Sequence, residues 1–291
     1  MTQEIWALAL HGGAGPTRAK IYEREEAHMA ALLDEGAARL GRGESALDVV
    51  VAMAKALEAS GMHIAGKGAA PNANGEWELD AALMDGASRR AGAVAALKGF
   101  ASPIECARLV MEKTPHVLLA GEGAESFCAA NGMAKIADPK GYYTPASSRL
   151  VAPGELAHGT IGAVARDTAG RLAAATSTGG LIGKQPGRIG DTPLIGAGTW
   201  ADARCAVSCT GQGELFIRAN VAADVSARML YTRQSLHAAA AGALADMETL
   251  GGDGGLIAVD ADGNVAMPFV SEGMKRAMAT SAGVRDVRTF R

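Results

Sequence analysis

The stretch His158-Gly159-Thr160-Ile161-Gly162-Ala163-Val164 stands where an irregular segment gives way to an apolar run that predicts a strand. A threonine at the start of a strand is commonplace. Cleavage of the Gly159–Thr160 bond, however, would give Thr160 a free α-amino group beside its hydroxyl. An α-amine has a pKa of about 8 and can serve as general base for a hydroxyl of the same residue. The stretch therefore has two interpretations, an ordinary strand residue and a self-activated nucleophile.

The segments on either side of this junction differ in composition. Residues 133–159 carry prolines, glycines and paired serines with little periodicity, which is typical of a linker. After the junction, residues 161–166 and 172–176 predict two strands joined by a turn at 167–170. Glycine at position 159 permits the backbone geometry that attack on its own carbonyl requires. Thr178 follows the second strand, and we expect it beside Thr160.

Strand-like and helix-like segments occur on both sides of the linker. The expected strands are 5–10, 79–84, 91–97, 161–166, 172–176, 194–198 and 205–209, with a last hairpin turning at 260–264. The expected helices are 22–40, 45–59 capped by Ser45, one starting at Ser102 and Pro103 with the serine as cap, 122–130, 214–230 and 234–250. Neither half is complete alone, so the pattern predicts two packed sheets flanked by helices.

The composition excludes several classes of protein. The 38 glycines follow no fixed period, which excludes collagen-like and solenoid folds. A net charge of −3 without a cluster of lysine and arginine argues against nucleic acid or an anionic membrane as a partner. Residues 1–13 do not form a signal peptide, and no apolar run is long enough to span a bilayer. The four cysteines lack metal-site spacing, so we expect reduced thiols in a cytoplasmic protein.

Several glycine-rich motifs occur in a specific order along the chain. They are residues 11–15 (HGGAG), 84–86 (MDG), 115–117 (PHV), 121–125 (GEGAE), 176–180 (TSTGG), 187–191 (GRIGD), 196–200 (GAGTW), 208–214 (SCTGQGE) and 254–257 (GGLI). With Thr160, this series resembles the plant-type L-asparaginase and isoaspartyl peptidase family of threonine N-terminal nucleophile hydrolases. The resemblance covers nearly the whole chain except the linker.

The resemblance implies a role for each matching residue. Thr160 would be the nucleophile, freed by autocleavage after Gly159, and Thr178 would hydrogen-bond it. Arg188 would bind the substrate α-carboxylate, a bidentate task that suits arginine, and Asp191 would bind the α-ammonium. The remaining implied substrate contacts are the oxyanion-hole residues Thr210 and Gly211, and the backbone of Gly213. Taken one at a time, Arg188 and Asp191 could equally be a surface ion pair, and residues 210–213 a helix N-terminal turn.

One position departs from the family pattern. Ile64 precedes Ala65-Gly66-Lys67-Gly68, where the family usually has an asparagine, and His63 beside it is also unusual. We interpret His63 as a loop histidine rather than a catalytic base. The family also has a structural sodium ion in this loop, bound by backbone carbonyls that here correspond to Leu57, Glu58, Ser60 and His63. No other cofactor is expected.

Three other interpretations of the sequence are possible. Residues 61–67 nearly spell a phosphate-binding P-loop, but Gly68 stands where a serine or threonine is needed, and the segment follows a helix. The His-Gly-Gly near the start resembles an α/β-hydrolase oxyanion loop, but no Gly-x-Ser-x-Gly elbow occurs. The third is a chain that keeps the fold, stays uncleaved or weakly active, and acts as a binding protein. Related branches that cleave glycosylated asparagine also stay open, although Thr178 and Asp191 favour the asparaginase branch.

The resemblance thus implies an α+β fold, a four-layer αββα sandwich of the N-terminal nucleophile hydrolase type. It implies one domain over residues 1–291 that matures into an α-subunit, 1–159, and a β-subunit, 160–291. The expected activity is hydrolysis of β-aspartyl amides, in isoaspartyl dipeptides, L-asparagine or both, with release of L-aspartate. The expected assembly is a dimer of αβ units.

Overall fold

The computed structural model describes residues 4–145 and 159–291, and its strands form two sheets. The eight-stranded sheet has the order β12-β11-β1-β5-β6-β2-β3-β4, and the four-stranded sheet has the order β10-β9-β8-β7. The strands of the first sheet are β1 (Ala7–Ala14), β2 (Leu79–Asp85), β3 (Ala91–Leu97), β4 (Leu118–Ala120), β5 (Ile161–Arg166), β6 (Leu172–Thr178), β11 (Met274–Thr280) and β12 (Arg285–Arg288). Those of the second are β7 (Thr199–Ala201), β8 (Cys205–Gly211), β9 (Gly254–Asp260) and β10 (Val265–Ala266).

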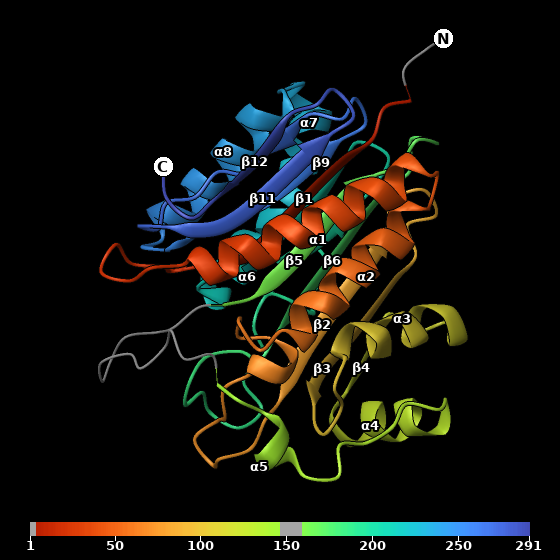
Figure 1. Ribbon diagram of the computed structural model, residues 1–291, viewed down its shortest axis with the longest axis vertical. Helices are drawn as coiled ribbons and strands as arrows, with labels where there is room; N and C mark the ends of the chain where they lie inside the picture. Colours follow the sequence, from red (N-terminus) through yellow and green to blue (C-terminus); the bar gives the residue numbers. More distant parts are fainter. Residues whose placement is uncertain (1–3, 146–158) are drawn as a thin grey trace.

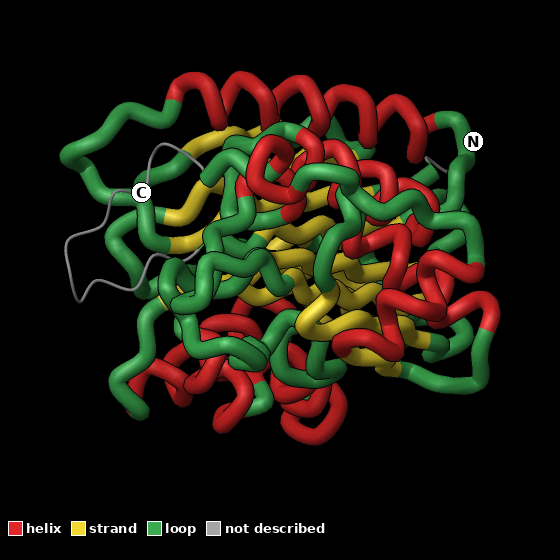
Figure 2. Tube along the Cα trace, turned by 90° about the horizontal axis from the view of Figure 1, so that it is seen from below, coloured by secondary structure: helices red, strands yellow, loops and turns green. Residues whose placement is uncertain are grey.

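Helices cover the outer face of each sheet, so that the molecule has four layers (Figures 1 and 2). The helices are α1 (Glu23–Gly41), α2 (Ala46–Ala59), α3 (Pro103–Lys113), α4 (Gly121–Ala130), α5 (Pro139–Tyr142), α6 (Gly213–Ala219), α7 (Val221–Thr232) and α8 (Leu236–Thr249), with a short 3-10 turn, η1 (Gly66–Gly68). Helices α1 to α4 pack on the eight-stranded sheet, and α6 to α8 pack on the four-stranded sheet. The expected αββα sandwich is therefore the fold of this chain.

Alternation along the strands divides the core into three layers. In β1, Leu8 and Leu10 pack under the helices, whereas Ala7 and Ala9 face the other sheet. Because side chains alternate with a period of two, residues of one parity share a face. By the same rule Gly162 of β5 lies between the sheets, as do residues 176 and 178 of β6 and residues 208 and 210 of β8. Every strand residue proposed for the site except Gly211 thus lies in the layer between the sheets.

The two halves of the sequence interleave in the large sheet. Strands β1 to β4 precede the Gly159–Thr160 bond, whereas β5, β6, β11 and β12 follow it. Strand β1 lies between β11 and β5, antiparallel to both, and β6 pairs with β2. Neither segment alone forms the eight-stranded sheet.

Most expected elements are present, and the differences have local causes. The expected strand 194–198 is wrong, because backbone bonds from Ala197 and Gly198 to the Leu194 carbonyl form turns there. The strand in this region is β7, which begins at Thr199, directly after the end of the expected range. The single expected helix 214–230 is two helices, α6 and α7, separated by Asn220 in the left-handed conformation (φ 51°).

The cap of α3 also differs from its expectation. Ser102 precedes Pro103 as predicted, but its hydroxyl makes no capping bond to the helix. It donates instead to the Glu58 carboxylate at 2.6 Å, and the other Glu58 oxygen accepts from the Ile104 amide at 3.0 Å. A glutamate from α2 therefore caps α3, a contact that the local sequence does not encode.

The expected linker has an ordered first part. Within residues 133–145, α5 is followed by Tyr143, which is buried, stacks on Trp77 and donates to the Phe100 carbonyl. The Thr144 amide then donates to the Lys67 carbonyl at 2.9 Å. Residues 146–158 of the expected linker lie outside the described residues. In the part of the chain that the structure describes, no helix is long and apolar enough to cross a membrane.

Candidate active site

Thr160 and Thr178 lie side by side at one end of the large sheet. The antiparallel register pairs Ile161 of β5 with Ser177 of β6. Thr160, which precedes Ile161, and Thr178, which follows Ser177, are therefore neighbours. The Thr160 hydroxyl donates to the Thr178 hydroxyl at 3.2 Å. Thr178 Oγ1 also accepts from the Gly180 amide at 3.0 Å, and its own proton points to the Ile64 carbonyl at 3.5 Å. These contacts orient Thr178 so that it accepts from the candidate nucleophile.

The glycine turn at the end of β1 packs against the bond before Thr160. Gly13 has a φ of 101°, which favours glycine, and a Cβ there would lie 2.7 Å from the Gly159 Cα. The ladder between β1 and β11 breaks its register between His11 and Ala14, at this turn. The turn therefore needs a bare backbone both for its own conformation and for its approach to Gly159.

Thr210 and Gly211 come to the site from the other sheet. They are the last two residues of β8, so the helix-turn alternative for residues 210–213 holds only for Gln212, the N-cap of α6, and Gly213, its first residue. The Thr210 hydroxyl oxygen accepts from the Ala14 amide at 3.1 Å. Its acceptor side is therefore engaged, and its proton is oriented to donate elsewhere. A side chain at Gly211 would collide with the Phe216 ring and the Gly254 backbone.

Arg188 makes an ion pair, but not with the residue that the sequence suggested. Its Nε and Nη2 both donate to the Glu214 carboxylate at 2.8 Å, a side-on bidentate pair. The Arg188 side chain is 15% exposed, whereas that of Glu214 is 55% exposed, so the pair points from the site toward solvent. A Cβ at Gly190 would lie 2.9 Å from Nη1, and one at Gly213 2.9 Å from Nη2. The glycines therefore leave room for the guanidinium to face the cavity.

Asp191 is a buried carboxyl group beside this guanidinium. Burial raises its pKa to about 7, against the opposing effects of its own backbone amide and of Arg188. Its Oδ2 has no hydrogen-bond partner among the described residues. A Cβ at Gly213 would lie 2.9 Å from its Oδ1, which explains a glycine there. A buried carboxylate oxygen without a donor is suited to bind a cation such as an ammonium group.

These residues share one small cavity. Its volume is about 10 Å³. Its lining residues are Gly159, Thr160, Thr178, Gly180, Leu181, Arg188, Gly190, Asp191 and Gly211. Thr210 and Gly213 do not line it. Thr210 directly precedes the lining residue Gly211, and Gly213 lies against the lining residues Arg188 and Asp191. The fold thus brings together residues that lie up to 52 positions apart in the sequence.

Two contacts were missed by the sequence reasoning. Glu214 pairs with Arg188 across 26 positions, and nothing in the spacing marks the pair. His11, noted only as part of a glycine-rich motif, lies 3.0 Å from the Thr160 carbonyl through Nδ1 and 2.8 Å from the Ser208 hydroxyl through Nε2. It is fully buried, and burial lowers its pKa to about 3. The ring is therefore neutral at ordinary pH.

The loop that departs from the family pattern supports the site through its backbone. The Ile64 carbonyl accepts from the Gly179 amide at 2.8 Å, next to Thr178, while its side chain packs with Ala70. His63 is also buried and its Nδ1 donates to the Gly12 carbonyl at 3.1 Å. The ring lies 6.4 Å from that of His28. His63 thus joins this loop to the glycine turn and does not line the cavity.

The same loop is the expected site of a cation. No group of three or more His, Cys, Asp or Glu side chains among the described residues is arranged to hold a metal ion. Carbonyl oxygens of this loop lie close to its glycines: those of Gly61 and His63 are beside Gly68, and that of Glu58 is beside Gly66. The Leu57 carbonyl already accepts both the amide and the hydroxyl of Ser60, and the His63 carbonyl accepts from the Ala65 amide at 2.8 Å. Two of the four expected carbonyl ligands are therefore engaged in hydrogen bonds within the loop.

The fold places the chain in the class of αββα sandwich proteins of the N-terminal nucleophile hydrolase type. A family model described as Asparaginase matches residues 4–150 and 145–289, and the chain belongs to this family. It is 48% identical to an isoaspartyl peptidase of Salmonella typhimurium, over 93% of this chain and 94% of the relative. It is 45% identical to an isoaspartyl peptidase of Escherichia coli, over 93% and 91%, and 39% identical to a human isoaspartyl peptidase/L-asparaginase, over 92% and 91%.

Proposed function

We propose that the chain is an autoproteolytically activated threonine amidohydrolase that cleaves β-aspartyl amide bonds and releases L-aspartate. The substrates are isoaspartyl dipeptides, L-asparagine or both, in keeping with the names of its relatives. One arrangement carries the proposal. Thr160, paired with Thr178, shares a cavity with a guanidinium and a buried carboxyl group that together complement the two charges of an α-amino acid.

Binding uses the α-carboxylate and α-ammonium of the aspartyl group. The Arg188 guanidinium holds the first and the Asp191 carboxylate the second, with the backbone of Gly213 close to both. These two charged contacts hold the same α-carbon and direct the side-chain amide toward Thr160, so that the attack takes place between positioned groups. The α-carboxylate competes with Glu214 for the guanidinium, so binding includes an exchange of one carboxylate partner for another.

The chemistry proceeds through an ester. The α-amine of Thr160 takes the hydroxyl proton as Oγ1 attacks the amide carbonyl, and the Thr210 hydroxyl and Gly211 amide stabilise the oxyanion. Collapse of the tetrahedral intermediate breaks the carbon–nitrogen bond, and the proton on the amine passes to the leaving ammonia or peptide amine. Water then hydrolyses the ester, releases L-aspartate and returns the threonine hydroxyl.

Cleavage after Gly159 precedes this reaction. While Gly159 is attached, Thr160 has no free α-amine, and the cavity of about 10 Å³ is far below the roughly 300 Å³ of small ligand sites. Gly159 forms part of its wall, so departure of the new chain end both unmasks the base and enlarges the site. The cut gives an α-subunit, 1–159, and a β-subunit, 160–291.

Intact mass of the denatured protein after several days of incubation tests the proposal. The wild type is expected to give two species split between Gly159 and Thr160 and to release aspartate from an isoaspartyl dipeptide. Thr160→Ala is expected to stay whole and inactive, and Thr168→Ala, the same change in the neighbouring turn, to behave as wild type. Activity in Thr160→Ala would refute the mechanism. An uncut wild type would mean either that Ile64 has disabled maturation or that the chain binds its ligand without catalysing.

Three further proposals follow from the resemblance. The first is that the enzyme is a dimer of αβ units. The second is that it is cytoplasmic, which the four free cysteines support, because disulfides form in oxidising compartments. The third is that a structural sodium ion binds the loop after α2 through backbone carbonyls of Leu57, Glu58, Ser60 and His63. Such an ion would fix the loop whose Ile64 carbonyl orients Thr178 and Gly179.

A further inference from the structure

A chain of buried polar side chains runs between the two sheets directly behind the candidate nucleophile. Its members are His11 on β1, Ser208 on β8, Thr176 on β6 and Thr199 on β7, and all four are 0% exposed. The Ser208 hydroxyl lies 2.8 Å from His11 Nε2 and 2.8 Å from the Thr176 hydroxyl, which lies 2.7 Å from that of Thr199. The proposed reaction uses none of these side chains, and four polar groups in an apolar layer are costly unless they are paired.

The direction of every hydrogen bond in this series of side chains follows from the acceptor at its His11 end. The Thr160 carbonyl oxygen can only accept, so His11 Nδ1 carries the ring proton and donates to it. Nε2 of the neutral ring then has a lone pair and accepts from Ser208. The single Ser208 proton is thereby committed, so its oxygen accepts from Thr176. Thr176 therefore accepts from Thr199 at 2.7 Å. The single Thr199 proton is then not available to the Thr192 carbonyl at 3.0 Å, nor the Thr176 proton to the Gly198 carbonyl at 3.5 Å.

Gly162 makes room for this chain. It lies on β5 opposite His11 on one side and opposite Thr176 on the other. A Cβ at this position would collide with the Ser208 hydroxyl and with the His11 ring. Strands β1 and β6 of the large sheet are therefore joined to β8 by hydrogen bonds as well as by apolar packing. This gives a physical reason for glycine two residues after Thr160.

This hydrogen-bonded series of side chains connects the nucleophile on one sheet with the oxyanion donor on the other. Thr160 belongs to the large sheet and Thr210 to the small one, so the packing of the sheets sets the distance between nucleophile and oxyanion donor. Ser208 and Thr210 lie on the same face of β8, two residues apart. His11 contacts Ser208, and the Ala14 amide contacts Thr210, so β1 holds β8 at both points.

We propose that His11 and Ser208 are positioning residues that fix the Thr160 backbone on one sheet against Thr210 on the other. The inference deepens the proposed function and rests on it. Neither side chain touches substrate: His11 acts on the Thr160 carbonyl, and Ser208 acts on His11. A misplacement of about 1 Å between reacting groups costs on the order of 100-fold in rate. Loss of the chain is therefore expected to lower kcat and leave KM nearly unchanged, because Arg188 and Asp191 keep their positions.

Ser208→Ala tests the inference, with Ser226→Ala as the matched control. Ser226 is likewise a buried serine with two hydrogen bonds, but it lies on α7 and contacts Asp202 and Arg204. In Ser208→Ala, kcat per cleaved chain, counted by intact mass, is expected to fall about tenfold or more while KM changes less than about twofold. Ser226→Ala is expected to keep the wild-type kcat at a comparable loss of thermal stability.

A second pair covers the case in which Ser208→Ala fails to fold. Thr176→Val removes the hydroxyl at constant shape, and Thr176→Ser retains it. We expect kcat to fall in the first and to stay near wild type in the second. Equal kcat in both Thr176 variants, or a kcat loss in Ser208→Ala no larger than in Ser226→Ala, would overturn the inference. An inactive wild type would instead overturn the proposed function, so the two failures are distinguishable.

Discussion

Asp191 sets a pH dependence at the scale of a single residue. Its pKa is raised to about 7 because burial destabilises the anion more than Arg188 stabilises it. Above this pH the carboxylate is charged and can pair with a substrate α-ammonium, whereas below it the group is neutral and the attraction is lost. We expect KM for an isoaspartyl dipeptide to be lowest above pH 7 and to rise by up to about tenfold per unit below it.

Steady-state kinetics from pH 5.5 to 8.5 would measure this dependence. Succinamate, which has the amide and α-carboxylate of L-asparagine but no α-ammonium, is the control substrate and is expected to show no such rise. Asp191→Asn should raise KM for the dipeptide and remove the pH dependence of KM. A wild-type KM that stays constant across the range would show that Asp191 does not bind the ammonium.

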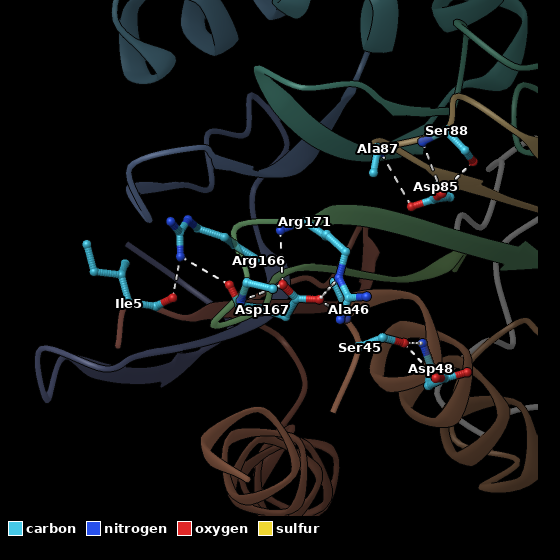
Figure 3. A network of polar contacts seen from close by, with 11 residues as sticks. Ile5, Ser45, Ala46, Asp48, Asp85, Ala87, Ser88, Arg166, Asp167 and Arg171 are labelled. Carbon is cyan, nitrogen blue, oxygen red and sulfur yellow. Dashed lines mark hydrogen bonds and ion pairs between the residues drawn. The ribbon is translucent and has the colours of Figure 1, made fainter. Parts of the chain in front are cut away.

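At the scale of elements, the start of α2 is fixed by two caps. The predicted cap is confirmed, since the Ser45 hydroxyl accepts from the Asp48 amide at 3.1 Å. A second cap comes from the β5–β6 turn, where Asp167 accepts from the Ala46 amide at 3.0 Å (Figure 3). Asp167 is buried and also accepts from the backbone of Ala169 and from both the backbone and side chain of Arg171. One carboxylate thus joins α2 to the hairpin that carries Thr160 and Thr178.

Replacement of Asp167 by alanine is expected to lower the free energy of unfolding by roughly 2–3 kcal/mol, because it leaves one buried amide, that of Ala46, and two partly buried amides without an acceptor. Asp85→Ala is the control. Asp85 accepts from the backbone of Ala87 and Ser88 in another hairpin turn, also drawn in Figure 3, but is more exposed. Its loss is expected to cost about 1 kcal/mol or less. Urea unfolding measures both, and equal losses would contradict the special role of Asp167.

At the scale of the whole molecule, the interleaved sheet predicts how the cleaved chain behaves. Strand β1 of the α-subunit lies between β11 and β5 of the β-subunit, and β6 of the β-subunit pairs with β2 of the α-subunit. Separation of the subunits would therefore break the ladders on both sides of β1 as well as that between β6 and β2. It would also expose the apolar layer between the sheets.

We expect the cleaved subunits to elute together in size-exclusion chromatography and to unfold in one transition. They should separate only at denaturant concentrations that also remove the secondary structure measured by circular dichroism. The uncut Thr160→Ala chain is the reference, with the same folded elution position. Subunits that separate in native buffer would contradict the interleaved arrangement.

The sequence alone determined the elements whose signals are local. Apolar runs, the Ser45 cap and the glycine turns specify most strands and helices, because these features act within a few residues. The Gly159–Thr160 junction makes Thr160 a candidate nucleophile, because the chemistry depends on one bond, and the family resemblance turns this candidate into a prediction. The failures were local as well: Asn220 in the left-handed conformation divides a continuous helical pattern, and turns at 194–198 replace a strand.

Only the tertiary structure decided which distant groups meet. His11 and Ser208 are 197 positions apart, Asp167 caps a helix 121 positions earlier, and Glu58 caps α3 from α2. Arg188 faces Glu214 rather than Asp191, which leaves the Asp191 oxygen available for a ligand. Such contacts depend on strand order and sheet packing, which follow from burial summed over the whole chain. No local pattern contains that sum, so the sequence proposes the reacting residues, and the fold decides how those residues are held.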